Sequence, residues 1–170
     1  NYASSGNGTV THLAGELLKL MGKVNIVHVP YKGGSPALAS LVSGETDMSY
    51  ENSLIILPQI KAGKLRGLAV TSDKRITDFP DIPTTAEAGM PDINFRTWFG
   101  LVAPAGTPQS VINTLVPAAA KVFKNPEIVK RAISAGFVPD YKGPDEFRQF
   151  IKIRQENAGK VAKEAGLSKK

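Results

Sequence analysis

The feature that most constrains the fold is a regular alternation of short β-forming segments with helices that have one apolar face. Residues 24–31 are rich in β-branched side chains, whereas residues 10–21 place apolar residues at the i, i+3, i+4 and i+7 spacing of an amphipathic helix. The alternation continues to a last helix that we expect to begin at Pro144. Strands that alternate with helices are typical of α/β proteins with mainly parallel sheets. The sequence therefore predicts an α/β fold.

Turn and capping residues define the expected bounds of these elements. Thr9 is a candidate N-cap, and Gly22 and Gly44 are candidate helix ends. Ser35 is expected to cap the second helix, with Pro36 at its first position. The predicted strands are 1–4, 24–31, 47–50, 65–71, 95–103 and 137–141. The predicted helices are 10–22, 35–44, 52–62, 107–123, 126–136 and 144 onward, with a short helix opened by a Thr84–Glu87 capping box.

Composition excludes several classes of function. The chain has 170 residues, of which 42% are hydrophobic, and this is enough to bury a core. It has no cysteine, which excludes disulfides, thiol catalysis and cysteine zinc sites. The net charge is +6, but the basic residues near the C-terminus alternate with Glu156 and Glu164, as on a solvated helix face. We therefore expect no nucleic-acid partner.

Three predicted strand-to-helix junctions carry residues suited to ligand binding, because ligands of open α/β sheets lie beyond the carboxyl ends of the strands. The first junction is the loop Ser4, Ser5, Gly6, Asn7, Gly8 and Thr9. Its glycines allow a close backbone approach, its hydroxyls donate hydrogen bonds, and the start of the following helix favours an anion. The loop lacks the spacing of a phosphate or dinucleotide motif. A polar turn with a helix cap is the alternative.

The other two junctions can complete such a site. In the second junction, Tyr31 can form a pocket wall, Lys32 can attract a carboxylate, and Gly33 and Gly34 lead into a helix; a surface turn with a solvated lysine is the alternative. The third junction is Glu51-Asn52-Ser53, where a carboxylate or amide can bind a ligand ammonium or hydroxyl. Helix capping by Asn52 or Ser53 is the alternative there.

The sequence offers no clear catalytic or metal-binding group. His12 and His28 have no partner at metal-ligand spacing, so we expect structural roles for both. The nucleophile-elbow pattern of α/β-hydrolases is absent. Trp98, the single tryptophan, fits either the core or a binding site. We therefore predict a protein that is not an enzyme and that uses no metal and no cofactor.

Several segments in order resemble one family. They are residues 3–9 (ASSGNGT), 28–34 (HVPYKGG), 60–71 (IKAGKLRGLAVT), 82–89 (IPTTAEAG) and 98–108 (WFGLVAPAGTP). Together they are similar to the Bug family, the TctC-like substrate-binding proteins of tripartite tricarboxylate transporters. The resemblance covers essentially the whole chain. It implies a two-lobed type II periplasmic-binding-protein (Venus flytrap) fold and a periplasmic location, with the signal peptide outside these residues.

The resemblance also implies ligands, partners and domains. Its members capture a small carboxylate or amino acid and deliver it to a membrane permease. Residues 1–94 would form the second lobe, ending in a proline-rich hinge region, and residues 95–170 would return into the first lobe. The residues implied to line the cleft are Ser4, Ser5, Gly6, Asn7, Gly8, Thr9, Tyr31, Gly33, Gly34, Asn52 and Trp98.

The chain is shorter than the family pattern. We expect it to lack the N-terminal half of the parent chain, which supplies most of the first lobe. A half-lobe without its leading strands would expose apolar surface, to be covered by the absent segment or by self-association. The alternative function is the effector-binding domain of a transcription regulator with a similar fold.

Overall fold

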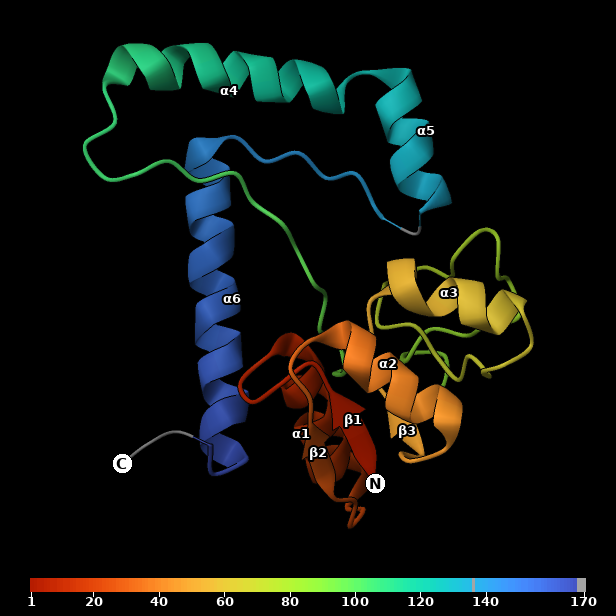
Figure 1. The fold of residues 1–170 in the computed structure, drawn as a ribbon. Helices are drawn as coiled ribbons and strands as arrows, with labels where there is room; N and C mark the ends of the chain where they lie inside the picture. Colours follow the sequence, from red (N-terminus) through yellow and green to blue (C-terminus); the bar gives the residue numbers. More distant parts are fainter. Residues whose placement is uncertain (136, 168–170) are drawn as a thin grey trace. The chain divides into compact units, whose positions relative to one another are not determined.

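The computed structural model describes residues 1–135 and 137–167, which form two compact units. Unit 1 contains Asn1–Thr97 and the chain from Asn157 onward, and unit 2 is Trp98–Glu156. Figure 1 shows the elements in chain order, coloured from the N-terminus to the C-terminus. They are β1 (Tyr2–Ser4), α1 (Val10–Gly22), β2 (His28–Pro30), α2 (Gly34–Ser43), β3 (Met48–Ser49), α3 (Ser53–Lys61), α4 (Gln109–Phe123), α5 (Pro126–Ser134) and α6 (Pro144–Glu164).

Unit 1 is built on a small parallel sheet, as the sequence predicts. The strand order is β2-β1-β3, so β1 is central and fully buried. Tyr2 pairs with His28 on one side and with Met48 on the other. Because all three strands run in the same direction, their carboxyl ends meet at one edge of the sheet. The loops that follow Ser4, Pro30 and Ser49 therefore come together there.

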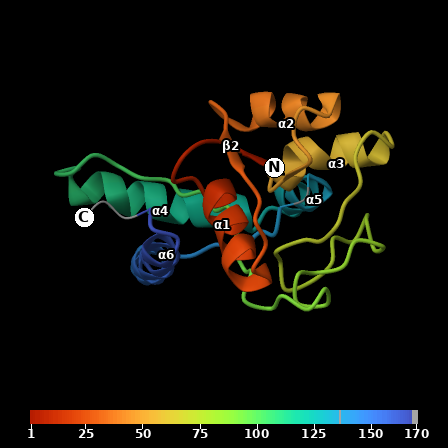
Figure 2. The same cartoon turned by 90° about the horizontal axis from the view of Figure 1, so that it is seen from below.

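Helices α1 and α2 cover the two faces of this sheet. The connection β1-α1-β2 runs to one side of β1, and β2-α2-β3 crosses back to the other side. Right-handed crossovers in opposite directions place their helices on opposite faces. Both helices contact β1, and Figure 2 shows them on either side of β2.

The core of unit 1 joins three segments that are distant in the sequence. Leu13 and Leu17 of α1 pack with Ile93, which is fully buried, and with Val161 of α6. Leu13, Leu17 and Val161 belong to the apolar faces expected for the first and last helices, whereas Ile93 lies in neither helix. Four such side chains contribute roughly 1.5–3 kcal/mol each when buried. The last turns of α6 are therefore part of the unit that carries the sheet.

Local capping signals set most helix ends as expected. The Thr9 hydroxyl accepts a hydrogen bond from the His12 N–H at 3.3 Å, and Gly44 ends α2 with a positive φ of 79°. Asn52 caps α3. The prediction that Ser35 caps α2 is wrong, because the N-cap is Gly33, two residues earlier, and the helix begins at Gly34. The φ of Gly33 is 111°, which a residue with a side chain rarely adopts, so this turn requires glycine.

Three of the predicted strands are not formed in the described residues. Residues 65–71 contain only an isolated bridge from Val70 to Thr84, and 95–103 and 137–141 are irregular. Their sequences favour strands, but a strand also needs a neighbour that offers free N–H and C=O groups. The capping box at Thr84 and Glu87 is present, with hydrogen bonds of 2.7 and 3.1 Å. The short helix that it was expected to open is not formed, because residues 85–89 are turns. Residue 136, the predicted end of the fifth helix, lies outside the described residues.

Unit 2 contains α4, α5 and the first turns of α6. Its described residues include an aromatic cluster in which Trp98 contacts Phe147 and Phe150 edge-on, with ring centroids 5.5 and 5.7 Å apart. Gly100 lies against the Phe147 ring. The boundary between the units falls between Thr97 and Trp98, and the assignment of residues 1–94 and 95–170 to two lobes stays a prediction.

Candidate functional site

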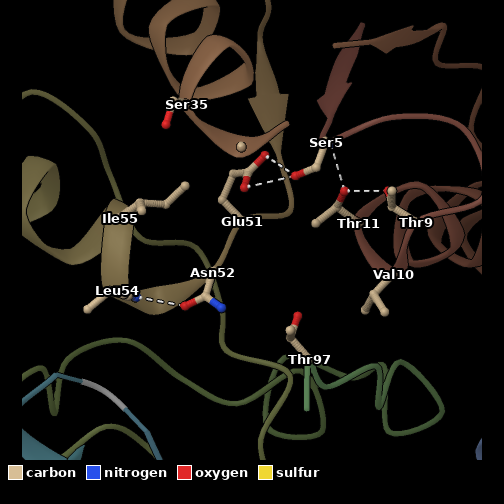
Figure 3. A pocket seen from close by; sticks show the side chains of 11 residues that line it. Ser5, Thr9, Val10, Thr11, Ser35, Glu51, Asn52, Leu54, Ile55 and Thr97 are labelled. Carbon is tan, nitrogen blue, oxygen red and sulfur yellow. Dashed lines mark hydrogen bonds between the residues drawn. The ribbon is translucent and has the colours of Figure 1, made fainter. Parts of the chain in front are cut away.

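A pocket of about 450 Å³ lies in unit 1, at the carboxyl ends of the three strands. Residues from all three predicted junctions line it, as Figure 3 shows. Ser5 follows β1, Gly34 follows β2, and Glu51 follows β3. The lining residues are Ser5, Thr9, Val10, Thr11, Gly34, Ser35, Glu51, Asn52, Leu54, Ile55 and Thr97.

The loop after β1 is held in place by its own hydrogen bonds. The Ser5 N–H donates to the Thr11 hydroxyl at 2.9 Å, and the Thr9 hydroxyl donates to the Gly6 carbonyl at 2.7 Å. Gly6 has a φ of 132°, and a side chain there would meet the Tyr31 carbonyl oxygen. The loop therefore needs glycine at this position and passes close to the second junction.

The start of α1 gives the pocket a side that favours an anion. Thr9 caps the N–H of His12, the third residue of the helix. The first N–H groups of a helix, here those of Val10 and Thr11, have no intrahelical acceptor. Together with the helix dipole they attract negative charge. Val10 and Thr11 both line the pocket, so a carboxylate bound there can accept hydrogen bonds from backbone N–H groups.

Glu51 lies at the third junction, after β3, and its side chain points toward Ser5 (Figure 3). The Ser5 hydroxyl donates to both carboxylate oxygens at 3.4 Å, and the Ser49 hydroxyl donates to one at 3.3 Å. Burial raises the pKa of Glu51, and hydrogen bonds from Ser49, the Asn52 backbone and Ser5 only partly offset this effect. No ion pair to Glu51 is found among the described residues. Glu51 is therefore a half-buried carboxylate with weak partners.

The rest of the wall comes mainly from the third junction. The Asn52 side chain accepts a hydrogen bond from the Leu54 N–H at 3.0 Å, so its amide oxygen caps α3. Leu54 and Ile55 add apolar surface, and Thr97 approaches from a segment far along the chain. The pocket thus combines an anion-favouring helix start, a carboxylate and an apolar wall, a combination that suits a small organic ligand.

A buried polar network of Ser4, His12 and His28 holds the loop after β1 in place. The Ser4 hydroxyl and His28 Nε2 are 2.6 Å apart, and the rings of His28 and His12 stack with centroids at 3.9 Å. His12 Nδ1 accepts a hydrogen bond from the Gly8 N–H at 3.0 Å. Ser4 is fully buried, so its contact with His28 lies out of reach of a substrate. The two histidines, expected to be structural, hold the loop against α1.

Glu16 anchors this network from α1. It accepts hydrogen bonds from the Tyr2 hydroxyl at 2.8 Å and from Lys19 at 2.9 Å. Burial by itself would raise the pKa of Glu16, but the hydrogen bonds from Lys19 and Tyr2 bring it below its ordinary value. Burial lowers the pKa of both His12 and His28, and the neighbouring His12 lowers the pKa of His28 further. Glu16 only partly offsets these effects. The network is therefore built around neutral histidines.

Four of the predicted site residues line the pocket: Ser5, Thr9, Gly34 and Asn52. The structure places Gly6, Asn7, Gly8 and Gly33 in the adjoining turns, whereas Ser4 is fully buried at the end of β1 and does not line the pocket. The Tyr31 N–H donates to the Ser4 carbonyl, and its buried hydroxyl has no hydrogen-bond partner in the described part of the chain. Trp98 belongs to unit 2, and Lys32 is exposed outside the pocket lining. Ligand contact by each of the eleven residues stays a prediction.

Sequence reasoning did not select several of the lining residues. Val10 and Thr11 could have been predicted, because the rule that a helix start binds anions applies to the first turn of the helix as well as to its cap. Glu51 was recognised at the third junction but was not chosen over Asn52. Ile55 reads as an ordinary apolar helix position, and Thr97 lies in a segment predicted to be a strand. No local signal marks either of these two as a lining residue.

Comparison with protein-family models shows the family to which the chain belongs. The model of the tripartite tricarboxylate transporter family receptor, TctC, matches residues 1–167. The chain belongs to this family, as its ordered motifs suggest. A UPF0065 protein of Pseudomonas sp. (strain P51), from the tcbD-tcbE intergenic region, is 36% identical over 99% of this chain and 50% of its own length. BugT of Bordetella pertussis is 33% identical over 99% of this chain and 52% of its own length.

Solved structures agree with this assignment. A periplasmic transporter protein matches with a TM-score of 0.90 and 41% identity, over 99% of this chain and 56% of its own. R. palustris Rpa4515, solved with adipate, matches with a TM-score of 0.89 and 34% identity, over 97% and 55%. These neighbours confirm the periplasmic-binding-protein fold. The chain spans about half the length of the relatives that it matches.

Residues 1–135 and 137–167 contain no group of three or more metal-ligating side chains placed to hold an ion. Within the same ranges no helix combines the length and the apolar character that a membrane crossing requires.

Proposed function

We propose that this chain forms the ligand-binding second lobe of an extracytoplasmic solute-binding protein, which captures a small carboxylate or amino acid for a tripartite tricarboxylate-type transporter. The observation that carries the proposal is the pocket at the carboxyl ends of β1–β3, with the capped start of α1 on one side. Backbone N–H groups at a helix start suit a carboxylate without a buried cation. Relatives with bound adipate and malate support the same class of ligand.

The proposed role is transport rather than catalysis. Binding followed by lobe closure about a hinge would give a shape that a membrane permease recognises, and no chemical step is needed. The fold of periplasmic relatives supports a periplasmic location. The family match favours this role over the effector-binding domain of a transcription regulator.

We further propose that a segment outside residues 1–170 completes unit 2. This segment would correspond to the N-terminal half of the relatives. Phe99, Leu101 and Val102 are 72%, 76% and 81% exposed, an unusual concentration of apolar surface on one segment. Without the absent half, self-association would cover this surface. Light scattering on the purified 170-residue chain should therefore give oligomers, and a stable monomer at high concentration would contradict the proposal.

A charge placed at the helix start tests the anion site. Val10→Asp puts a carboxylate at the first helical position of α1, where the helix dipole stabilises it by about 0.3–1 kcal/mol. The same charge would repel a ligand carboxylate from the pocket. We therefore expect Val10→Asp to keep or raise the thermal midpoint and to weaken binding of small carboxylates at least tenfold.

Val10→Asn is the matched control, because the asparagine side chain has nearly the same shape as that of aspartate but carries no charge. We expect it to bind within about threefold of the original chain, since only an uncharged side chain has changed. The measurement is a calorimetric titration with glutamate, 2-hydroxyglutarate, glutarate and adipate. Equal binding by the Asp and Asn variants, or no binding of any acid by the unchanged chain, would refute the anion site.

A further inference from the structure

We propose that Glu51 selects the ligand, so that the pocket prefers a carboxylate that also carries a hydrogen-bond donor, above all an ammonium group, over a plain di-anion. This inference rests on the proposed function and names the class of ligand within it.

The charge of the pocket favours a ligand with a positive group. Of the eleven lining residues, Glu51 is the one with an ionisable side chain, and it is an acid. Lys32, the nearest basic residue in the second junction, is exposed and does not line the pocket. A ligand with two carboxylates would therefore bring both charges close to a third one, without a cation from the lining. An ammonium group would neutralise Glu51 instead.

The partners of Glu51 leave it able to accept more hydrogen bonds. A carboxylate has about four acceptor positions. Besides the Asn52 backbone N–H, its donors are the hydroxyls of Ser5 and Ser49, which lie at 3.3–3.4 Å, beyond the usual length for a hydroxyl donor. In the described residues no cation lies within ion-pair distance of Glu51. A charge-assisted bond from a ligand would be shorter and stronger than these contacts.

The site is arranged so that one small molecule can reach both groups. Ser5 connects them, because its N–H donates to Thr11 at the α1 start and its hydroxyl donates to Glu51. Gly34 leaves room for the acid, since a Cβ at this position would come 3.0 Å from Glu51 Oε2. A ligand carboxylate at the α1 start would thus share a pocket of about 450 Å³ with Glu51. An amino or hydroxy group on the same short ligand would serve as the donor to Glu51.

Protonation of Glu51 gives the preference a pH dependence. Burial raises the pKa of this group in the free pocket, and an ammonium ligand would lower it again. A donor-bearing ligand therefore binds best above the free-state pKa, and its affinity falls as the pH drops through that value. The Ser5, Ser49 and Asn52 groups that face Glu51 do not titrate in this range, and comparison with Glu51→Gln separates the titration of Glu51 from that of the ligand carboxylates and of His12 and His28.

Three matched acids and two variants test the inference. Glutamate, 2-hydroxyglutarate and glutarate differ only in an ammonium, a hydroxyl or a hydrogen at one carbon, and each is titrated into the 170-residue chain. We expect glutamate to bind at least tenfold more tightly than glutarate, with 2-hydroxyglutarate between them. Glu51→Gln should remove this order by weakening glutamate while glutarate binds equally or better.

Glu45→Gln is the control, because Glu45 is an exposed acid of unit 1 that does not line the pocket. It changes the net charge by the same amount and should keep the order of the three acids. If the unchanged chain binds glutarate as tightly as glutamate, or if Glu51→Gln alters all three acids alike, the inference is overturned and the proposed function stands. If the chain binds none of them, the proposed function fails as well.

Discussion

Replacement of Gly6 by alanine should damage the pocket more than the same change two residues later. Gly6 has a φ of 132°, in a region that is nearly closed to residues with a side chain, and a Cβ there would lie 3.1 Å from the Tyr31 carbonyl oxygen. Backbone strain of this kind costs about 1–3 kcal/mol. The close contact adds roughly 1 kcal/mol, because a backbone oxygen has to move.

The loop cannot easily relax around the new methyl group. The Gly6 N–H donates to the Ser4 hydroxyl at 3.1 Å, and the Gly6 carbonyl accepts from both the hydroxyl and the N–H of Thr9. We therefore expect Gly6→Ala to reduce the free energy of unfolding by about 2–4 kcal/mol. For a chain of 170 residues, 1 kcal/mol shifts the thermal midpoint by about 2–4 °C. The midpoint should therefore fall by about 4–16 °C.

Gly8→Ala is the matched control in the same loop. Gly8 has a φ of 75°, and a side chain there would meet nothing within 4 Å. The cost should be about 1–2 kcal/mol, from the left-handed conformation alone. Circular dichroism at 222 nm during heating measures both variants. If Gly6→Ala unfolds at the same temperature as Gly8→Ala or above it, the account of the loop is wrong.

Three further predictions concern unit 1. Gly15→Ala should destabilise the protein by about 1–3 kcal/mol, because the new methyl group would overlap the buried Tyr2 ring. In Gly159→Ala the methyl group meets no neighbour of α6, so the free energy of unfolding should rise by up to about 1 kcal/mol. Chemical denaturation compares the two variants. Burial lowers the folded-state pKa of His12 and His28, so the free energy of unfolding should be largest above about pH 6.5 and fall as the pH drops toward 5. A flat profile in that range would count against the neutral histidine pair.

The sequence predicted the parts of the fold that depend on local chemistry. Thr9, Asn52 and Gly44 act within one or two turns of themselves, so their capping roles could be recognised from residue type and spacing. The prediction for Ser35 failed because Gly33, with its positive φ, turns the chain two residues before the expected cap. Capping rules alone do not decide which of several adjacent small residues makes the turn.

Long-range pairing could not be predicted in the same way. Residues 95–103 and 137–141 have the composition of strands, but their hydrogen bonds depend on which other segment lies beside them. The candidate site was more accessible, because parallel strands bring their carboxyl ends together whatever the details of the loops. This rule located Ser5, Gly34 and Glu51, whereas Thr97 arrives from a distant segment that no local pattern connects to the pocket.

A nuclear magnetic resonance titration of the ¹⁵N-labelled chain with glutamate tests the central claim most directly, because it detects weak binding and locates it. The account predicts saturable shifts of the amide signals of Ser5, Val10, Thr11, Gly34 and Glu51, the residues that surround the pocket. The amide signals of α4 in unit 2 should stay unchanged. Shifts confined to unit 2, or no saturable shift at millimolar concentrations of ligand, would contradict a carboxylate site at the carboxyl ends of β1–β3.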